Sequence, residues 1–278
     1  ALVCTRPGKQ GKVYLPADDY PEFVPDDEAI RQRIAALCDG TGLTVPDEEI
    51  SPVRPSPNAR GLSAVTRHGL RRFADLYTPR QMLCLLSFAA AVRRLSVGRA
   101  AQPGEHGAAV ATYLACVLDK QVDFNSSLCV LKADGGRAIV HTFGRQALPM
   151  VWDFAEANPF NAEIASWASS LDEVVANVGA LGAGGSPEVV RGSATSLPWP
   201  DASLDAVITD PPYYDNVPYA DISDFFYVWL KRTIGHLYPE HFATEGTPKK
   251  QEAVADAVRY GGSKEKAKQA YEQMMAQS

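Results

Sequence analysis

The chain has 278 residues, 46% of them hydrophobic, which is enough for one large domain or two small ones. No run of about 18 apolar residues occurs and the first residues lack a signal-peptide pattern, so we expect no membrane span and a cytoplasmic location. The five cysteines are widely spaced and the five histidines lack metal-ligand spacing. The composition therefore predicts neither a disulfide framework nor a metal site.

Charge is unevenly distributed along the chain. The net charge of −6 argues weakly against nucleic-acid binding, but residues 60–99 contain eight arginines and one acid, whereas residues 201–245 contain eight acids and two bases. This asymmetry suits a protein that binds a polyanion with its basic segment and carries out chemistry elsewhere. Solvated helix faces would explain the same arginines, and the charge pattern alone does not decide between the two.

The first 185 residues predict mostly helices. KVYLP reads as a short strand, DDEAIRQRIAALCDG as a helix that stops at Gly40, and residues 40–70 as a long loop. Strong helices are expected over 78–95, where Thr78 is the N-cap and Pro79 follows, and over 104–124; a further helix is expected over about 161–178. We therefore expect an N-terminal strand, helix and loop in 1–70 and a mostly helical region in 71–185.

The pattern changes at residue 186. PEVVRGSA (187–194) and LDAVITD (204–210) read as short strands, and residues 219–232 carry apolar side chains at 222, 225, 226, 229 and 230, the stripe of an amphipathic helix. Strand, loop, strand, loop and helix is the order found in half of a doubly wound α/β sheet. We therefore expect an α/β fold in which residues 186–278 form half of a Rossmann-like domain.

The loop TDPPYYDNVPY (209–219) lies between the second strand and this helix. In doubly wound sheets, ligands bind at the carboxyl ends of the strands, where Asp210 stands. Pro211 and Pro212 fix their φ angles and lack N–H groups, so they stiffen the loop and leave carbonyls to accept hydrogen bonds. With the flat ring of Tyr213, these groups suit a planar target that bears an NH2 group. The alternative is a plain Asp-Pro-Pro turn with a surface tyrosine.

DPPY resembles the catalytic motif of amino-methyltransferases, and longer segments resemble one family. It is the large DNA adenine methylases with the domain of unknown function 1156, some of which contain a zinc ribbon. The segments that carry the resemblance are LYTPRQ (76–81), TFGRQALPMVWDFAEANPF (142–160), GSATSLP (192–198), TDPPYYDNVPYADISDFFYVWLKR (209–232) and YPEHFATEGTPKKQE (238–252). The resemblance implies a class I, Rossmann-like methyltransferase that uses S-adenosyl-L-methionine to methylate N6 of a flipped adenine in DNA.

The resemblance also implies roles for particular residues. It makes the motif residues catalytic: Asp210, Pro211, Pro212 and Tyr213. It places Ser193 and Ala194 in a turn against the adenine of the cofactor, although a plain turn would read the same way. Three further residues are candidates for substrate binding: Tyr214 and Tyr219, which could edge the base pocket or merely pack, and Arg80, which could contact phosphate or satisfy its neighbours.

Two features of the family are not found in this sequence, the glycine-rich cofactor loop and the zinc ribbon. GALGAGG (179–185) follows a helix and reads as a helix end. We therefore interpret the chain as an internal or split piece of a larger methylase, whose glycine loop lies in an upstream segment or subunit. The alternatives are methylation of cytosine N4, RNA or a glutamine amide, and, outside the enzymes, a nucleic-acid-binding or assembly module.

Overall fold

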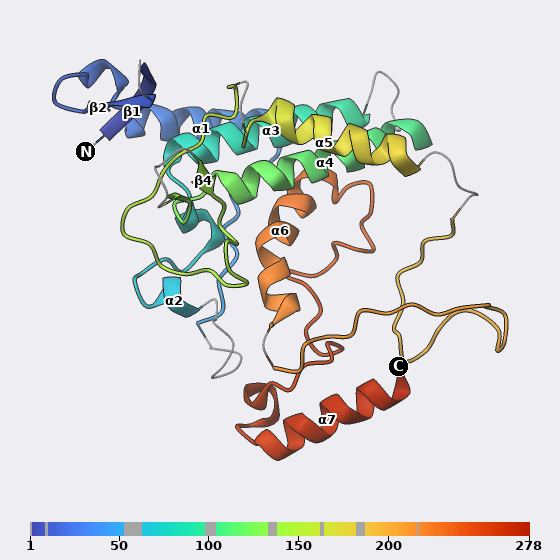
Figure 1. Ribbon diagram of the computed structural model, residues 1–278. Coiled ribbons are helices and arrows are strands. Elements are labelled where there is room, and N and C mark those ends of the chain that lie inside the picture. The colour runs from blue at the N-terminus through green and yellow to red at the C-terminus, as the bar shows by residue number, and fades with distance from the viewer. Residues whose placement is uncertain are drawn as a thin grey trace.

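The computed structural model describes residues 2–8, 11–52, 63–97, 104–132, 138–161, 164–181, 187–215 and 217–278. Figure 1 shows a stack of helices with a small hairpin at one end, a helix that crosses beneath the stack, a long extended segment and a final helix set apart. The glycine-rich run 179–185 lies largely outside the described residues.

Helices dominate the described residues. The elements are β1 (Leu2–Gly8), β2 (Gly11–Pro16), α1 (Asp27–Thr41), α2 (Ser63–Thr66), α3 (Pro79–Val97), α4 (Glu105–Phe124), β3 (Val130–Leu131), β4 (Ile139–Val140), α5 (Trp167–Leu181), α6 (Tyr219–Ile234) and α7 (Lys264–Gln277), with short 3-10 turns η1 (Pro21–Phe23), η2 (Phe73–Leu76) and η3 (Ala257–Tyr260). The strand in KVYLP and the helices expected near residues 27, 79, 105 and 219 are confirmed. The helix expected from 161 begins instead at Trp167.

Capping residues explain where two of these helices begin and end. The Thr78 hydroxyl accepts the Gln81 N–H at 3.2 Å and the Gln81 side chain accepts the Thr78 N–H at 2.9 Å, a reciprocal capping box at the start of α3. Helix α1 runs through Gly40 and ends one residue later. The glycine that ends the helix is Gly42, which adopts the left-handed conformation at φ 68°, and not Gly40 as predicted.

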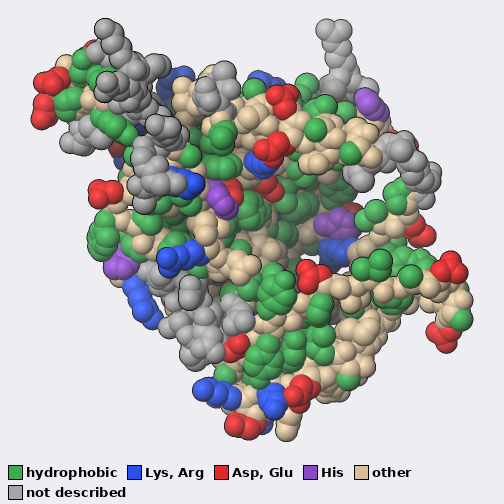
Figure 2. Space-filling model, in the orientation of Figure 1, with side chains coloured by type: hydrophobic (Ala, Val, Ile, Leu, Met, Phe, Trp, Pro, Cys, Tyr) green, Lys and Arg blue, Asp and Glu red, His purple; other side chains and the backbone are tan. Residues whose placement is uncertain are grey.

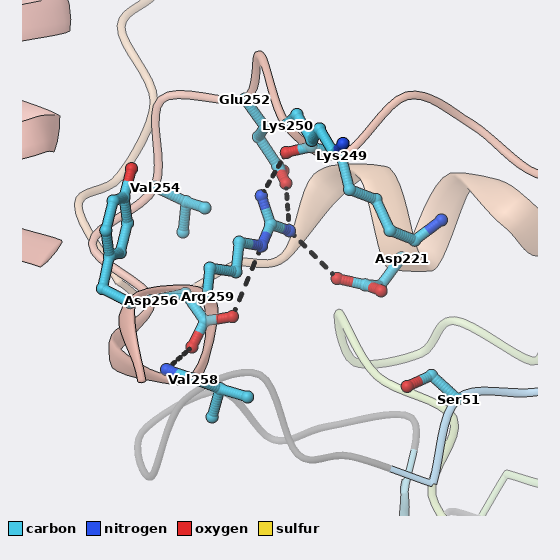
Figure 3. Close-up of a pocket in the computed structure, with 10 residues that line it drawn as sticks. Ser51, Asp221, Lys249, Lys250, Glu252, Val254, Asp256, Val258 and Arg259 are labelled. Carbon is cyan, nitrogen blue, oxygen red and sulfur yellow. Dashed lines mark hydrogen bonds and ion pairs between the residues drawn. The ribbon is translucent and has the colours of Figure 1, made fainter. Parts of the chain in front are cut away.

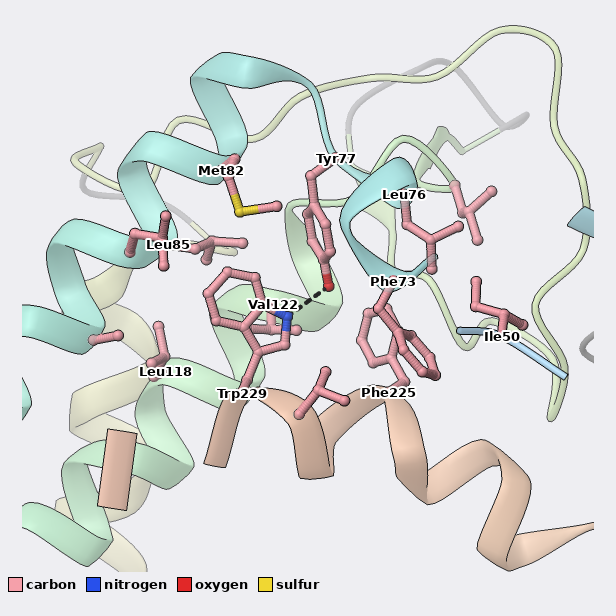
Figure 4. Close-up of a cluster of buried hydrophobic side chains, with 14 of the residues drawn as sticks. Ile50, Phe73, Leu76, Tyr77, Met82, Leu85, Leu118, Val122, Phe225 and Trp229 are labelled. Atoms are coloured by element: carbon pink, nitrogen blue, oxygen red, sulfur yellow. Dashed lines mark hydrogen bonds between the residues drawn. The ribbon is translucent and has the colours of Figure 1, made fainter. Parts of the chain in front are cut away.

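The main core lies between α3, α4 and α6 (Figure 4). Phe225 and Trp229 of α6 are fully buried, and Trp229 Nε1 donates a hydrogen bond to the Tyr77 hydroxyl at 3.0 Å. The Tyr77 ring also packs edge-on against the indole, with the ring centroids 5.4 Å apart. The helix that follows the DPPY loop is therefore anchored in the same core as the helices of the 71–185 region.

A buried arginine fastens the other side of α6. Arg232 donates to the carbonyl oxygens of Thr44 and Val45 at 2.8 and 2.6 Å and to the carboxylate of Glu48 at 2.8 Å. The segment after α1 is thereby held against α6. Among the described residues, no helix combines the length and hydrophobicity needed to cross a bilayer.

The described residues contain two small antiparallel sheets, β1–β2 and β3–β4, and no parallel sheet. The two segments expected as strands, 187–194 and 204–210, run extended and join no ladder apart from a single bridge between Ser193 and Ser196. A strand needs a neighbour to satisfy its backbone groups, and neither segment has one among the described residues. The structure is thus mixed, with mostly helices and small sheets, and the part of the chain that it describes does not form the expected half of a Rossmann-like sheet.

Candidate functional site

The DPPY loop is open to solvent. Asp210, Pro211 and Tyr213 are exposed, and Tyr213 as a whole residue is 52% accessible. No described residue donates a hydrogen bond to the Asp210 carboxylate or to the Pro211 carbonyl. The loop thus offers two unoccupied acceptors beside an exposed aromatic face, the combination that a planar NH2 group would use.

Tyr219, in the first turn of α6, lies near Tyr213 and Asp210. Partial burial and then these two neighbours raise the pKa of the Tyr219 hydroxyl. The structure therefore brings one of the candidate pocket residues together with the acid and the first tyrosine of the motif.

The second tyrosine of the motif is strained and held in place. Tyr214 has φ 49°, a left-handed conformation that costs a side-chain-bearing residue about 1–2 kcal/mol. Its carbonyl accepts the Ala255 N–H at 3.0 Å, and its ring packs edge-on against Tyr271 of α7 with centroids 5.0 Å apart. Tyr214 thus faces α7 and has a packing role in this structure.

The Pro212 carbonyl is already used. It accepts the Tyr214 N–H at 3.0 Å and the Tyr271 hydroxyl at 2.9 Å, which occupies both of its lone pairs. The proline carbonyl left to bind a substrate is therefore that of Pro211.

A pocket of about 490 Å³ lies beside the first turn of α6 (Figure 3). Arg259 is at its centre and binds Glu252 at 2.6 Å, Asp221 at 3.2 Å and Asp256 at 3.4 Å. Burial raises the pKa of Asp221, and the positive charges of Lys249 and Arg259 partly offset this. Burial likewise raises the pKa of Asp256.

These charges tie residues 249–260 to α6. Glu252 accepts the backbone N–H of Ala220, and Lys249 binds Asp224 at 2.6 Å. Because the carboxylates of the pocket are paired with Arg259, we interpret this pocket as a structural element that supports the DPPY loop. We call residues 249–260, with Arg259 and its ion pairs, the brace. The same segment contains Ala255, so the brace reaches the DPPY loop itself.

The two candidate cofactor residues lie apart from this site. Ser193 and Ala194 are exposed, and the hydrogen bonds of Ser193 with other described residues go to Thr195 and Ser196. Every residue from 187 to 210 is exposed. They would supply at most one edge of a cofactor site.

Arg80 is bound to a carboxylate of the same chain. Its Nε and Nη2 atoms each lie 2.7 Å from Glu156, whose second oxygen accepts the Thr78 hydroxyl at 2.8 Å. This contact joins LYTPRQ to WDFAEANPF, two of the segments that carry the family resemblance. The guanidinium therefore satisfies its neighbours here, which was one of its two expected roles.

Tyr271 and Arg259 both hold the loop, and the sequence did not single them out. The sequence signal for α7 was weak and concerned only its start: Ser263 is an N-cap that accepts the Lys266 N–H, and good helix formers follow it. No cluster of three or more potential metal ligands occurs among the residues that the structure places.

Comparison of the chain with protein-family models, with curated proteins and with solved structures gave no match. The resemblance to the adenine methylases therefore depends on the sequence segments quoted above alone.

Proposed function

We propose that the chain is part of an S-adenosyl-L-methionine-dependent methyltransferase that modifies the exocyclic amine of a flipped base, most directly adenine N6 in DNA. In this proposal it belongs with the DNA adenine methylases that contain the domain of unknown function 1156. The observation that carries the proposal is the DPPY loop, where the Asp210 carboxylate and the Pro211 carbonyl are both unoccupied beside the exposed ring of Tyr213.

The loop suits this reaction because an aromatic amine is a poor nucleophile, its lone pair being delocalised into the ring. Asp210 and Pro211 would each accept one N–H of the amine, which favours a tetrahedral nitrogen and stabilises the positive charge that develops there. Tyr213 would stack on the base and offset part of the few kcal/mol that leaving the DNA stack costs. When bound, S-adenosyl-L-methionine supplies the methyl group.

The extended segment 187–210 supports the view that the fold is completed by another part. Val189, Val207 and Ile208 are 90%, 67% and 95% exposed, and Figure 2 shows hydrophobic side chains along this segment. Strands of parallel sheets are apolar because helices cover both faces. We propose that 187–194 and 204–210 are strands of a Rossmann-like sheet completed by the segment or subunit that carries the glycine-rich loop.

The same exposed segment favours one other candidate, a non-catalytic assembly or nucleic-acid-binding module. In that case the segment would dock on a partner without forming a cofactor site. Within the enzyme class, the two acceptors would serve cytosine N4, RNA adenine or a glutamine amide equally well, since each presents a planar NH2 group.

Isothermal titration with S-adenosyl-L-methionine tests the proposal. We expect no heat with the chain alone and saturable binding once the segment with the glycine loop is added. Binding by the chain alone would mean that the cofactor site is complete without that segment. No binding in either mixture would contradict the methyltransferase proposal and favour the assembly module.

A further inference from the structure

Helix α7 lies apart from the helical core and reaches the DPPY loop (Figure 1). One face of it is apolar and at least half-buried, through Ala267, Ala270, Tyr271 and Met274. These positions are three or four residues apart, so they form one stripe on the helix. Among the described elements, α7 packs chiefly on η3, which belongs to the brace around Arg259.

Tyr271 makes two different contacts with the loop. Its hydroxyl donates to the Pro212 carbonyl at 2.9 Å, and its ring meets Tyr214 edge-on at an interplanar angle of 88°. Tyr214 is held in its left-handed conformation between this ring and the Ala255 N–H. A residue keeps such a conformation only where the surroundings over-determine it.

We propose that Tyr271 is a positioning residue of the methyl-transfer site, a role that rests on the function proposed above. By binding the Pro212 carbonyl, its hydroxyl fixes the peptide plane between Pro212 and Tyr213. That plane sets the direction of the Tyr213 ring and keeps the second proline carbonyl from competing for the amine. The Pro211 carbonyl and the Asp210 carboxylate are then the acceptors that remain for the substrate.

This role has a kinetic consequence. Among the described residues, Tyr271 forms no hydrogen bond or ring contact with Asp210, Pro211 or Tyr213, so its loss should leave the binding of DNA nearly intact. A misplaced loop would instead lower the rate of the chemical step, because errors of about 1 Å in the alignment of reacting groups can cost about a hundredfold. A residue that only anchored α7 would change stability without this separation of kcat from KM.

Tyr271→Phe removes the hydroxyl and keeps the ring, and Tyr271→Leu removes both. Tyr113→Phe is the matched control, because Tyr113 is an exposed tyrosine of α4 with no hydrogen bond to its hydroxyl among the described residues. Hydrogen–deuterium exchange reports on the loop through the amides of Tyr214 and Ala255, and it does not depend on activity. Tritium transfer from S-adenosyl-L-methionine to unmethylated DNA gives kcat and KM, with the glycine-loop segment present and with Asp210→Ala run alongside.

With Tyr271→Phe we expect these two amides to exchange about fivefold faster, as fits the loss of one hydrogen bond, and kcat to fall about tenfold at an unchanged KM for DNA. Tyr271→Leu should exceed both effects, and Tyr113→Phe should match the wild type. Unchanged exchange, or normal kcat in Tyr271→Phe while Asp210→Ala is inactive, would overturn the positioning role and leave the proposed function standing. Equal transfer by the wild type and Asp210→Ala would instead overturn the proposed function and the positioning role with it.

Discussion

Replacing Arg232 by methionine tests how α6, and with it the DPPY loop, is anchored. The Arg232 side chain is 7% exposed and the Glu48 side chain 14%, so Arg232→Met leaves a nearly buried carboxylate without its cation. It also removes the donors to the carbonyls of Thr44 and Val45. Breaking one side of a buried ion pair typically costs 3–5 kcal/mol, so we expect the free energy of unfolding to fall by about 4 kcal/mol.

Urea denaturation followed by tryptophan fluorescence measures this loss. The double variant Arg232→Met with Glu48→Met should regain about 2 kcal/mol, because the stranded charge is gone and only the two carbonyls, at about 1 kcal/mol each, remain unsatisfied. Arg31→Met is the matched control, because Arg31 pairs with Asp27 and Glu28 on the open surface and should cost at most about 0.5 kcal/mol. The reasoning fails if Arg232→Met costs under about 1 kcal/mol or if the double variant is less stable than the single one.

Two further predictions concern stability. Burial, and then the neighbouring carboxylate of Asp123, raise the pKa of Asp119 well above its ordinary value, so the ionised form of this group opposes folding. The Asp119→Asn variant should therefore become more stable relative to the wild type as the pH rises above about 4. The urea midpoints of the variant and the wild type, measured at about pH 4 and about pH 8, check this prediction. A difference in midpoint between the two proteins that is the same at both pH values would contradict it. A Cβ added at Gly246 would lie 2.9 Å from the Asp224 carboxylate, so Gly246→Ala should cost about 1–3 kcal/mol, whereas Gly40→Ala, in the open on α1, should stabilise by about 0.5–1 kcal/mol. Thermal melts give the change in melting temperature caused by each variant. Equal changes in the two variants would refute the steric argument.

The helices could be predicted because their signals are local. The Thr78 cap and the helix predicted from the apolar stripe of 219–232 each depend on a few turns of chain, and both are confirmed, although only Phe225 and Trp229 of the stripe are fully buried. Helix α7 has a mostly polar sequence with a narrow stripe, which indicates no particular partner. The two expected strands failed to form a sheet because strand pairing depends on neighbours, and a strand pattern cannot supply them.

The candidate site was predictable only in part, for the same reason. The stiffness of the Asp-Pro-Pro-Tyr loop follows from the covalent properties of its prolines, whereas the tertiary fold decides that the Pro212 carbonyl is bound by Tyr271. The contact of Tyr271 with Pro212 spans 59 positions, and that of Arg80 with Glu156 spans 76. Contacts at such separations arise from the tertiary fold, so the sequence left the role of Arg80 open and did not reveal Tyr271.

The central claim is that the Asp210 loop methylates an amine of DNA. Mass spectrometry of nucleosides from DNA incubated with S-adenosyl-L-methionine, the chain and the glycine-loop segment tests it most directly. Asp201→Ala serves as the control, because Asp201 is an exposed acid that lies between the two proposed strands and belongs to neither. We expect N6-methyladenine from the wild type and from Asp201→Ala and none from Asp210→Ala. Methylated product that persists in Asp210→Ala, or no methylated nucleoside from any of the three proteins, would contradict the claim.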